Sequence, residues 1–401
     1  MKKILFVIDS IGCGGAERAL IALLNQLDYS KYYVDLLYFC HTNEYYKEQI
    51  PEDVHILTPD LSTQFALSSG SFVLKNMRHI KYLPLILYRI WTGVSGKVNQ
   101  KNYFRRRAKD WKRLKPYVLP LSGSYDAAVA FIETNSVYYT MDRVTAKKYI
   151  VWQHTDYRGT NCCADWDRPY FNRSSRICVL SKEMKEQFLN EFPDLEDRVL
   201  IFPNVINHTE ILSKSDETAE FDDDYRGIRM ISSGTLRQVK GYDVAIRACR
   251  RLAEDGLDFR WYVLGSGEQK DRILDEVKRL GLQKHFILLG NKRNPYPYIK
   301  RSDIFVQCSY REGFSTTVYE AKCLQKPIVV TDAPGMGNQI KNGVNGLVVP
   351  VGDDKKVAEA IRMLMSSSKL KQEFSEELGK FLQGIKDDTK DKLELFDKII
   401  N

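Results

Sequence analysis

The sequence predicts an α/β protein made of two parallel-sheet domains. Short apolar runs, of the kind that form fully buried strands, recur along the chain, and helical patterns alternate with them. This alternation is typical of βαβ units, in which neighbouring strands run parallel. The length of 401 residues is enough for two or three domains, and a hydrophobic content of 43% supplies their cores. The polar and acidic stretch 207–227 divides the chain and predicts a linker.

The first domain is expected over residues 1–206. Its strand candidates are the apolar runs 4–8, 34–39, 54–57, 127–132, 149–152 and 177–180, and a helix is expected over 16–27. The opening MKKILFVID is too short for a secretion signal and leads into a glycine loop, which predicts a first strand instead. Gly14 and Gly15 in that loop lack the spacing of a dinucleotide fingerprint. They can still bring N–H groups at a helix N-terminus close to a phosphate or a hydroxyl.

The second domain is expected over residues 228–381, where four strand–loop–helix units follow one another. The expected strands end in glycine or charged loops: 230–233 before Gly234, Arg237 and Lys240; 259–264 before Gly265 and Gly267; 285–290 at Gly290; and 303–309 before Glu312. In an open parallel sheet these loops lie at the carboxyl ends of the strands, where ligands bind.

The segment REGFSTTVYEA carries two glutamates with seven residues between them, Glu312 and Glu320. The first is expected in the loop after a strand, and the second about two helical turns further on, at about 1.5 Å of rise per residue. Two carboxylates so placed can each accept hydrogen bonds from vicinal sugar hydroxyls. Gly313 permits close backbone approach, and the N–H groups of 314–316 are expected to face outward, as anion binding requires. The alternative is an ordinary solvated helix with two acids.

The order of these four units and the EGF start resemble the donor half of glycosyltransferase family 4, over roughly residues 230–350. The resemblance implies the GT-B fold, with two Rossmann-like domains facing a cleft, and retention of configuration at the transferred sugar. It implies that residues 1–206 bind the acceptor and that 228–381 bind a nucleotide-sugar. It also implies that a last helix, about 382–401, crosses back onto the first domain.

The same resemblance suggests roles for individual residues. Lys240 and Arg237 would stabilise the negative charge that develops on the diphosphate, although this chain has Thr235 where the family usually has arginine. Glu312 would hold the donor sugar, and His154 would lie near it. The expected donor-binding set is Gly14, Gly15, Gly234, Gly265, Gly267, Gly290, Arg293, Gly313, Phe314, Ser315 and Glu320, with Glu320 on the ribose and the base near 290–293. A solvated helix start and a packed histidine are the alternatives for Lys240 with Arg237 and for His154.

Neither a metal nor another cofactor is expected. No DxD-type acid cluster sits at a predicted strand end, and the acids at 222–224 lie in the expected linker as a solvated charge run. The eight cysteines include no CxxC pair, which is typical of reduced residues in a cytoplasmic protein.

Residues 75–115 are strongly basic, with a single acid, Asp110, and are interleaved with Tyr, Trp and aliphatic residues. This pattern favours a peripheral element on an anionic membrane surface at the inner face of the cell membrane. A solvated helical pair and a single-strand nucleic-acid groove are the alternatives. No nucleic-acid-binding signature accompanies the pattern, so nucleic acid is not expected as a partner.

The sequence therefore predicts a retaining, metal-independent glycosyltransferase that moves a hexose from a nucleotide-sugar, most simply a UDP-sugar. The acceptor would be a lipid-linked or cell-surface polysaccharide. A sugar-nucleotide epimerase on the same fold, and a non-catalytic carbohydrate- or nucleic-acid-binding protein, are the alternatives.

Overall fold

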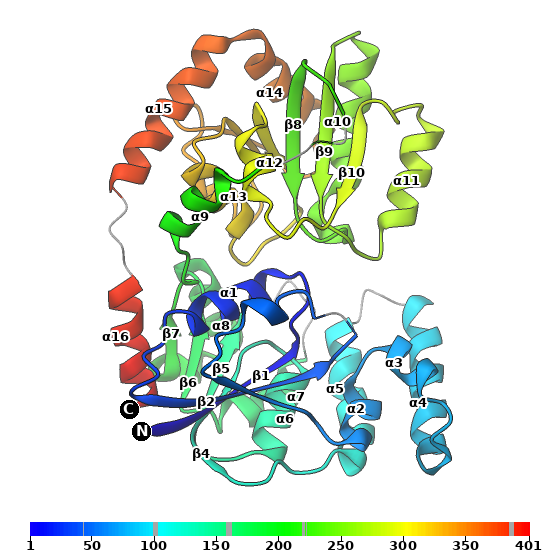
Figure 1. The fold of residues 1–401 in the computed structure, drawn as a ribbon, viewed down its shortest axis with the longest axis vertical. Helices are drawn as coiled ribbons and strands as arrows, with labels where there is room; N and C mark the ends of the chain where they lie inside the picture. The colour runs from blue at the N-terminus through cyan, green and yellow to red at the C-terminus, as the bar shows by residue number, and fades with distance from the viewer. Residues whose placement is uncertain (43, 99–102, 158–162, 219–220, 222, 385–388) are drawn as a thin grey trace. The chain divides into compact units, whose positions relative to one another are not determined.

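The computed structural model describes residues 1–42, 44–98, 103–157, 163–218, 221, 223–384 and 389–401. The chain divides into two compact units, residues 1–206 with 389–401 and residues 207–388. Each unit is a parallel β-sheet with helices packed against it (Figure 1). The two predicted parallel-sheet domains are therefore confirmed.

The first unit contains a seven-stranded sheet in the order β3-β2-β1-β4-β5-β6-β7, with every neighbouring pair parallel. Its strands are β1 (Lys2–Ser10), β2 (Tyr32–Cys40), β3 (Val54–Leu57), β4 (Ser124–Ala130), β5 (Thr145–Gln153), β6 (Arg176–Val179) and β7 (Val199–Ile201). Phe6 of β1 is in register with Leu36 on one side and Val129 on the other. The strand order reverses at β1, and in such sheets the loops beside the reversal point bind ligands.

Helices connect these strands. They are α1 (Gly15–Leu24), α2 (Leu61–Leu67), α3 (Gly70–Lys75), α4 (Leu83–Val98), α5 (Tyr103–Leu114), α6 (Asn135–Arg143), α7 (Ala164–Phe171), α8 (Lys182–Glu191) and the C-terminal α16 (Thr389–Ile400), with 3-10 turns η1 (Lys47–Gln49), η2 (Ile80–Tyr82), η4 (Lys115–Tyr117) and η6 (Pro193–Arg198). In α16, Phe396 is fully buried and stacks on Phe6, and Asp397 accepts a hydrogen bond from the Tyr32 hydroxyl at 2.5 Å. The last twelve-residue helix thus packs on the first unit.

The second unit contains a six-stranded parallel sheet in the order β10-β9-β8-β11-β12-β13. The strands are β8 (Ile228–Ser233), β9 (Phe259–Leu264), β10 (Phe286–Gly290), β11 (Ile304–Gln307), β12 (Ile328–Thr331) and β13 (Leu347–Val349). The helices are α9 (His208–Ser215), α10 (Tyr242–Glu254), α11 (Lys270–Arg279), α12 (Tyr296–Lys300), α13 (Thr316–Cys323), α14 (Asp354–Ser366) and α15 (Ser368–Gly384), with η7 (Gln238–Lys240) and η8 (Gly337–Gln339). Val244, Ala248 and Leu252 recur every four residues in α10 and are fully buried, which is the helical period facing a core.

The stretch 207–227, expected as a linker, instead begins with a helix that packs in the second unit. Helix α9 contacts α12 and α13, and its first turn is capped by the Asn207 side chain, which accepts from the Glu210 N–H at 2.9 Å. Asp223, expected in a solvated charge run, accepts a hydrogen bond from the Tyr262 hydroxyl and pairs with Arg260 at 2.6 Å. Packing against the sheet therefore overrides the polar composition of this stretch; Asp222 lies outside the described residues.

Candidate functional site

Main-chain hydrogen bonds join the loops that follow three neighbouring strands of the second unit. The Gly234 N–H donates to the Leu264 carbonyl at 2.9 Å, and the Gly265 N–H donates to the Gly290 carbonyl at 2.9 Å. A Cβ atom on Gly265 would lie 2.0 Å from the Gly234 carbonyl oxygen, so only glycine fits there. Similarly, a Cβ atom on Gly267 would lie 2.6 Å from the Leu236 oxygen. These glycines let the loops after β8, β9 and β10 pack closely.

Gly241 brings the loop after β8 against the end of β11. It has φ +67°, and a Cβ atom there would lie 1.9 Å from the Cys308 carbonyl oxygen. The preceding residue, Lys240, runs its side chain beside Gly234, and the Tyr242 hydroxyl donates to the Gly234 carbonyl at 2.9 Å. This turn therefore delivers the Lys240 ammonium to the carboxyl end of β11.

Lys240 and Glu312 are in direct contact. The Lys240 Nζ lies 2.8 Å from both Glu312 carboxylate oxygens, and the two side chains are 18% and 9% exposed. The Ser309 hydroxyl also donates to Glu312 Oε1 at 2.6 Å. Two of the predicted catalytic residues, from loops after different strands, thus meet at one place.

The loop between Glu312 and α13 differs in part from the expected anion cradle. The Ser315 N–H donates to the Gly335 carbonyl at 3.2 Å and the Thr316 N–H to the Phe314 carbonyl at 3.1 Å, so these two N–H groups are already used within the protein. Within the described residues, the N–H groups of Gly313 and Phe314 donate to no protein acceptor. Glu320 lies on α13 and is 2% exposed.

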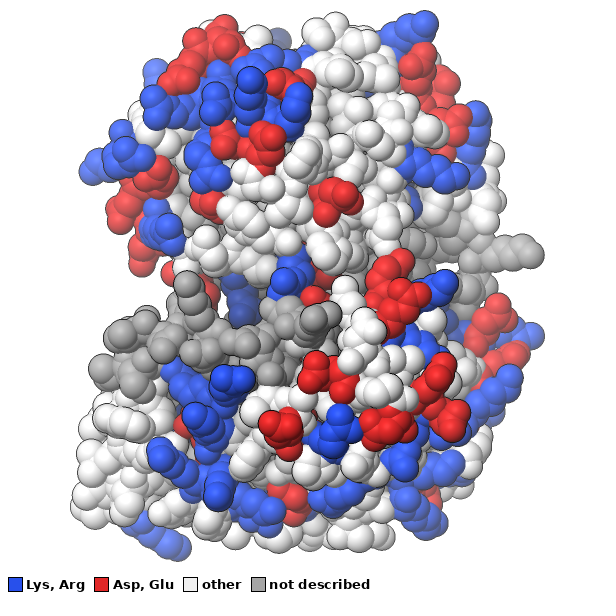
Figure 2. All heavy atoms as spheres, turned by 180° about the vertical axis from the view of Figure 1, so that it is seen from behind, with Lys and Arg blue, Asp and Glu red and all other residues white. Residues whose placement is uncertain are grey.

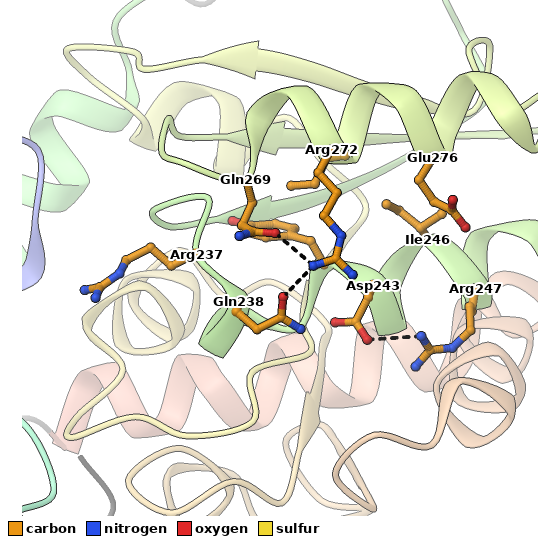
Figure 3. A pocket seen from close by; sticks show the side chains of 10 residues that line it. Arg237, Gln238, Asp243, Ile246, Arg247, Gln269, Arg272 and Glu276 are labelled. Carbon is orange, nitrogen blue, oxygen red and sulfur yellow. Dashed lines mark hydrogen bonds and ion pairs between the residues drawn. The ribbon is translucent and has the colours of Figure 1, made fainter. Parts of the chain in front are cut away.

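Arg237 lies in the loop after β8, directly before η7. It borders a cavity of about 230 Å³ between α10 and α11, but in Figure 3 its guanidinium extends away from the other labelled side chains. Arg272 fills part of this cavity and donates to Gln238 at 3.1 Å and Gln269 at 3.3 Å. The cavity is smaller than the roughly 300–1,000 Å³ of typical ligand pockets, so it is too small to enclose a nucleotide-sugar.

The loop expected near the base follows β10. Gly290 has φ +71°, Arg293 is exposed, and the Asn291 amide donates to the Ser266 hydroxyl at 2.8 Å. The loops after β9 and β10 are therefore joined by side chains as well as by main-chain bonds.

In the first unit, Gly14 caps the N-terminus of α1, which begins at Gly15. A Cβ atom on Gly14 would lie 2.1 Å from a Glu17 carboxylate oxygen, and Glu17 also accepts from the Ser10 hydroxyl at 3.1 Å. The Glu17 carboxylate thus folds back over the start of its own helix, where negative charge is favourable.

His154 follows β5 and is 9% exposed, with its ring centroid 4.9 Å from that of Phe131. Burial lowers the pKa of its imidazole to about 3, so the ring is neutral at ordinary pH. Its Nε2 is buried and has no hydrogen-bond partner among the described residues. A neutral imidazole with an unused nitrogen can exchange a hydrogen bond with a ligand hydroxyl.

Two residues that were not predicted from the sequence hold Glu312 and His154 in place. Ser309 is fully buried and contacts Glu312, and Glu133, 6% exposed, accepts a 2.6 Å hydrogen bond from the His154 N–H. Beside it, Thr134 has φ +74°, a conformation that is strained for a β-branched residue. A polar residue directly at the end of an apolar strand is the signal that could have pointed to Ser309 and Glu133.

Residues 75–115 form α4, α5 and the turns beside them, and 99–102 lie outside the described residues. Part of the segment is core: Trp111 is 1% exposed and donates to Asp142 at 2.9 Å. Its outer side carries large exposed apolar residues at Met77, Ile80, Leu83, Leu87 and Trp91. Figure 2 shows Lys and Arg side chains gathered beside an uncharged surface. This surface lies at the edge of the first unit where Figure 1 places α4. Among the described residues, none of the helices is both long and apolar enough to cross a membrane.

Comparison with known proteins now identifies the second unit. Residues 216–380 match the family model for glycosyl transferases group 1. The second unit therefore matches a group 1 glycosyltransferase domain over most of its length. An uncharacterized glycosyltransferase of Methanocaldococcus jannaschii is 32% identical over 41% of this chain and 41% of its own length. The chain therefore spans less than half of that relative in the alignment.

Two further comparisons cover the whole chain. An N-acetylgalactosaminyltransferase of Campylobacter jejuni, named for an undecaprenol-diphosphate-linked acceptor, is 24% identical over 100% of this chain and 97% of its own. The crystal structure of Anabaena HepE with UDP and glucose superposes with a TM-score of 0.68 at 16% identity, covering 99% of both chains. With the two parallel sheets, these comparisons make the chain a glycosyltransferase of the GT-B fold.

In the described part of the chain, His, Cys, Asp and Glu side chains form no group of three or more that could hold a metal ion. Metal independence and the individual residue roles stay predictions.

Proposed function

We propose that the protein transfers a hexose from a UDP-sugar to a lipid-linked or cell-surface polysaccharide acceptor, with retention of configuration and without a metal. The observation that carries this proposal is the contact between Lys240 and Glu312 beside the glycine loops of the group 1 domain. It combines a cation for a diphosphate with a carboxylate for sugar hydroxyls.

The chemistry requires stabilisation of the leaving group. As the bond between the sugar C1 and the diphosphate oxygen breaks and the acceptor oxygen bonds to C1, negative charge grows on the diphosphate, whose leaving oxygen takes up the proton that the acceptor hydroxyl loses. Lys240 is the cation in this role, with Arg237 as the second cation of the same loop. Each charge-assisted hydrogen bond to a phosphate oxygen contributes about 1.5–3 kcal/mol. Glu320 binds the ribose hydroxyls in this proposal.

The choice of donor and acceptor rests on relatives. HepE was solved with UDP and glucose, and the Campylobacter relative is named for a diphospho-undecaprenol substrate. His154 and the loop containing Gly14 belong to the first unit, which we assign to the acceptor and the transferred sugar.

A nucleotide-sugar panel tests the donor. The melting temperature is measured against UDP, GDP, ADP and their hexose conjugates in EDTA. A ligand that binds only the folded state adds about 2.7 kcal/mol of stability at a hundredfold excess over Kd. Stabilisation by UDP and by one UDP-hexose is expected. No stabilisation by any nucleotide would contradict the proposed donor site.

We also propose that the protein acts as a peripheral enzyme at the inner face of the membrane. The exposed apolar residues 77–91 adjoin Lys75, Arg78 and Lys81, which combines insertion into the interface with attraction to anionic lipid. This surface suits an enzyme whose acceptor is carried by a lipid. Flotation with vesicles of 30% phosphatidylglycerol, compared with neutral vesicles, tests it.

A further inference from the structure

The Lys240 ammonium is already neutralised inside the protein. Its Nζ is 2.8 Å from each carboxylate oxygen of Glu312, and both side chains are largely buried. A buried ion pair is less screened by solvent than an exposed one. The cation that a diphosphate needs is therefore bound to a protein carboxylate through two of its three N–H groups, and a diphosphate competes with that carboxylate for the charge.

Glu312 has a second contact that does not involve Lys240. The fully buried Ser309 donates its hydroxyl proton to Glu312 Oε1 at 2.6 Å. The Ser309 Oγ accepts from the Gln307 side chain at 3.1 Å, which leaves its own proton for Glu312. The Ser309 carbonyl is in turn fixed by the Thr331 hydroxyl at 2.6 Å. Ser309 is thus anchored to β11 and β12 and can hold Glu312 by itself.

We propose that Lys240 exchanges Glu312 for the diphosphate of the donor, while Ser309 keeps Glu312 in position to accept hydrogen bonds from the transferred sugar. This inference rests on the proposed function. Glu312 then weakens the binding of UDP that carries no sugar. UDP must break the Lys240–Glu312 ion pair, which leaves the buried Glu312 carboxylate with Ser309 as its partner. A UDP-sugar supplies the hydroxyl groups that replace Lys240 as partners of Glu312. Ser309 is the positioning residue that makes this replacement possible.

The exchange predicts opposite effects of one substitution on binding and on turnover. Glu312→Gln frees Lys240, so UDP is expected to bind roughly threefold to tenfold more tightly by calorimetry, while transfer from the UDP-sugar falls. Glu359→Gln is the matched control, because it removes an exposed Lys–Glu pair on α14 that joins Lys356 and Glu359 at 2.7 Å. The Glu359→Gln protein should bind UDP with the same affinity as the unmodified protein.

A double substitution separates the exchange from simple repulsion between a carboxylate and a diphosphate. In Lys240→Gln protein, the further change Glu312→Gln should give no gain in UDP affinity, because no lysine is left to release. A gain that persists in this background would overturn the exchange. Unchanged or weaker UDP binding by Glu312→Gln protein would also overturn it.

Ser309→Ala tests the positioning role. Its UDP affinity should stay within about twofold of the unmodified protein, since Lys240 still holds Glu312 before the nucleotide arrives. The ratio of the Kd for UDP to the Kd for the UDP-sugar should fall, because Glu312 is no longer held once Lys240 leaves. An unchanged ratio would remove Ser309 from this role.

Failure of the proposed function and failure of the exchange give different results. If the unmodified protein binds no UDP, the proposed function itself fails. If it binds UDP but Glu312→Gln does not strengthen that binding, only the exchange fails.

Discussion

The Glu133 carboxylate lies 2.6 Å from the main-chain nitrogen of His154 and accepts its hydrogen bond. The same oxygen accepts from the N–H of Thr155 at 2.6 Å and from its hydroxyl at 3.0 Å. Glu133 follows β4 and His154 follows β5, so one side chain ties together the ends of two neighbouring strands. The position of the His154 ring is therefore set by a residue outside its own loop.

Glu133→Ala should destabilise the protein. It leaves the two N–H groups and the hydroxyl without their common acceptor, and an unsatisfied buried polar group costs about 1–3 kcal/mol. Urea denaturation should show a loss in that range, and Glu133→Gln, which keeps an acceptor oxygen, should lose less. Equal stability of Glu133→Ala and the unmodified protein would show that these bonds do not hold the loop.

His154 should make stability depend on acid pH. Its pKa is about 3 in the folded protein, below the ordinary 6.5, so the folded state binds fewer protons than the unfolded state between these values. Stability should therefore fall as pH drops from about 6.5 towards about 3, by up to about 1.4 kcal/mol per pH unit.

The measurement is the free energy of unfolding at pH 7 and pH 5 for the unmodified protein and for His154→Gln. The difference between the two proteins isolates the imidazole from other acids that titrate in this range. Parallel pH profiles would contradict a buried neutral His154.

Gly241→Ala should cost more stability than Gly281→Ala. Both glycines have φ near +70°, which costs an L-residue about 1–2 kcal/mol. A Cβ atom at 241 also meets the Cys308 carbonyl at 1.9 Å, whereas at 281 nothing lies within 4 Å. Denaturation of both variants separates backbone strain from collision; equal losses would mean that the loop after β8 moves freely away from β11.

The apolar surface on η2 and α4 should contribute to vesicle binding. Replacing Ile80, Leu87 and Trp91 by serine should weaken binding to anionic vesicles by at least about tenfold, because burying such side chains contributes about 1.5–3 kcal/mol each. Met363→Ser, at a 52% exposed position on α14, is the control. If the triple variant floats with vesicles as well as the control, this surface does not meet the membrane.

The sequence predicts both sheets and most strands, because a parallel strand buried on both faces is a short apolar run that stands out from its surroundings. Strands β7 and β13 have three residues each and β12 has four; all three escaped prediction, since so short a run need not show a period. Helix α9 was not predicted because its polar and charged composition is typical of a linker. The helix start is marked by Asn207, whose side chain accepts a hydrogen bond from the Glu210 N–H.

The candidate site shows a similar limit. Motif spacing places Lys240 and Glu312 in loops after two strands, but it does not reveal that the two side chains bind each other. That contact depends on Gly241, whose left-handed turn passes the Cys308 carbonyl. Ser309 and Glu133 are polar residues at the ends of apolar strands, but they act through Glu312 and His154, so the sequence around them does not show which residues they contact.

Calorimetric titration of UDP in EDTA, into the unmodified protein and into Lys240→Ala, tests the central claim most directly. The account predicts that the unmodified protein binds UDP and that Lys240→Ala, still folded by circular dichroism, binds it at least about tenfold more weakly, as loss of a charge-assisted hydrogen bond requires. Equal affinities, or no binding of UDP by the unmodified protein, would contradict it.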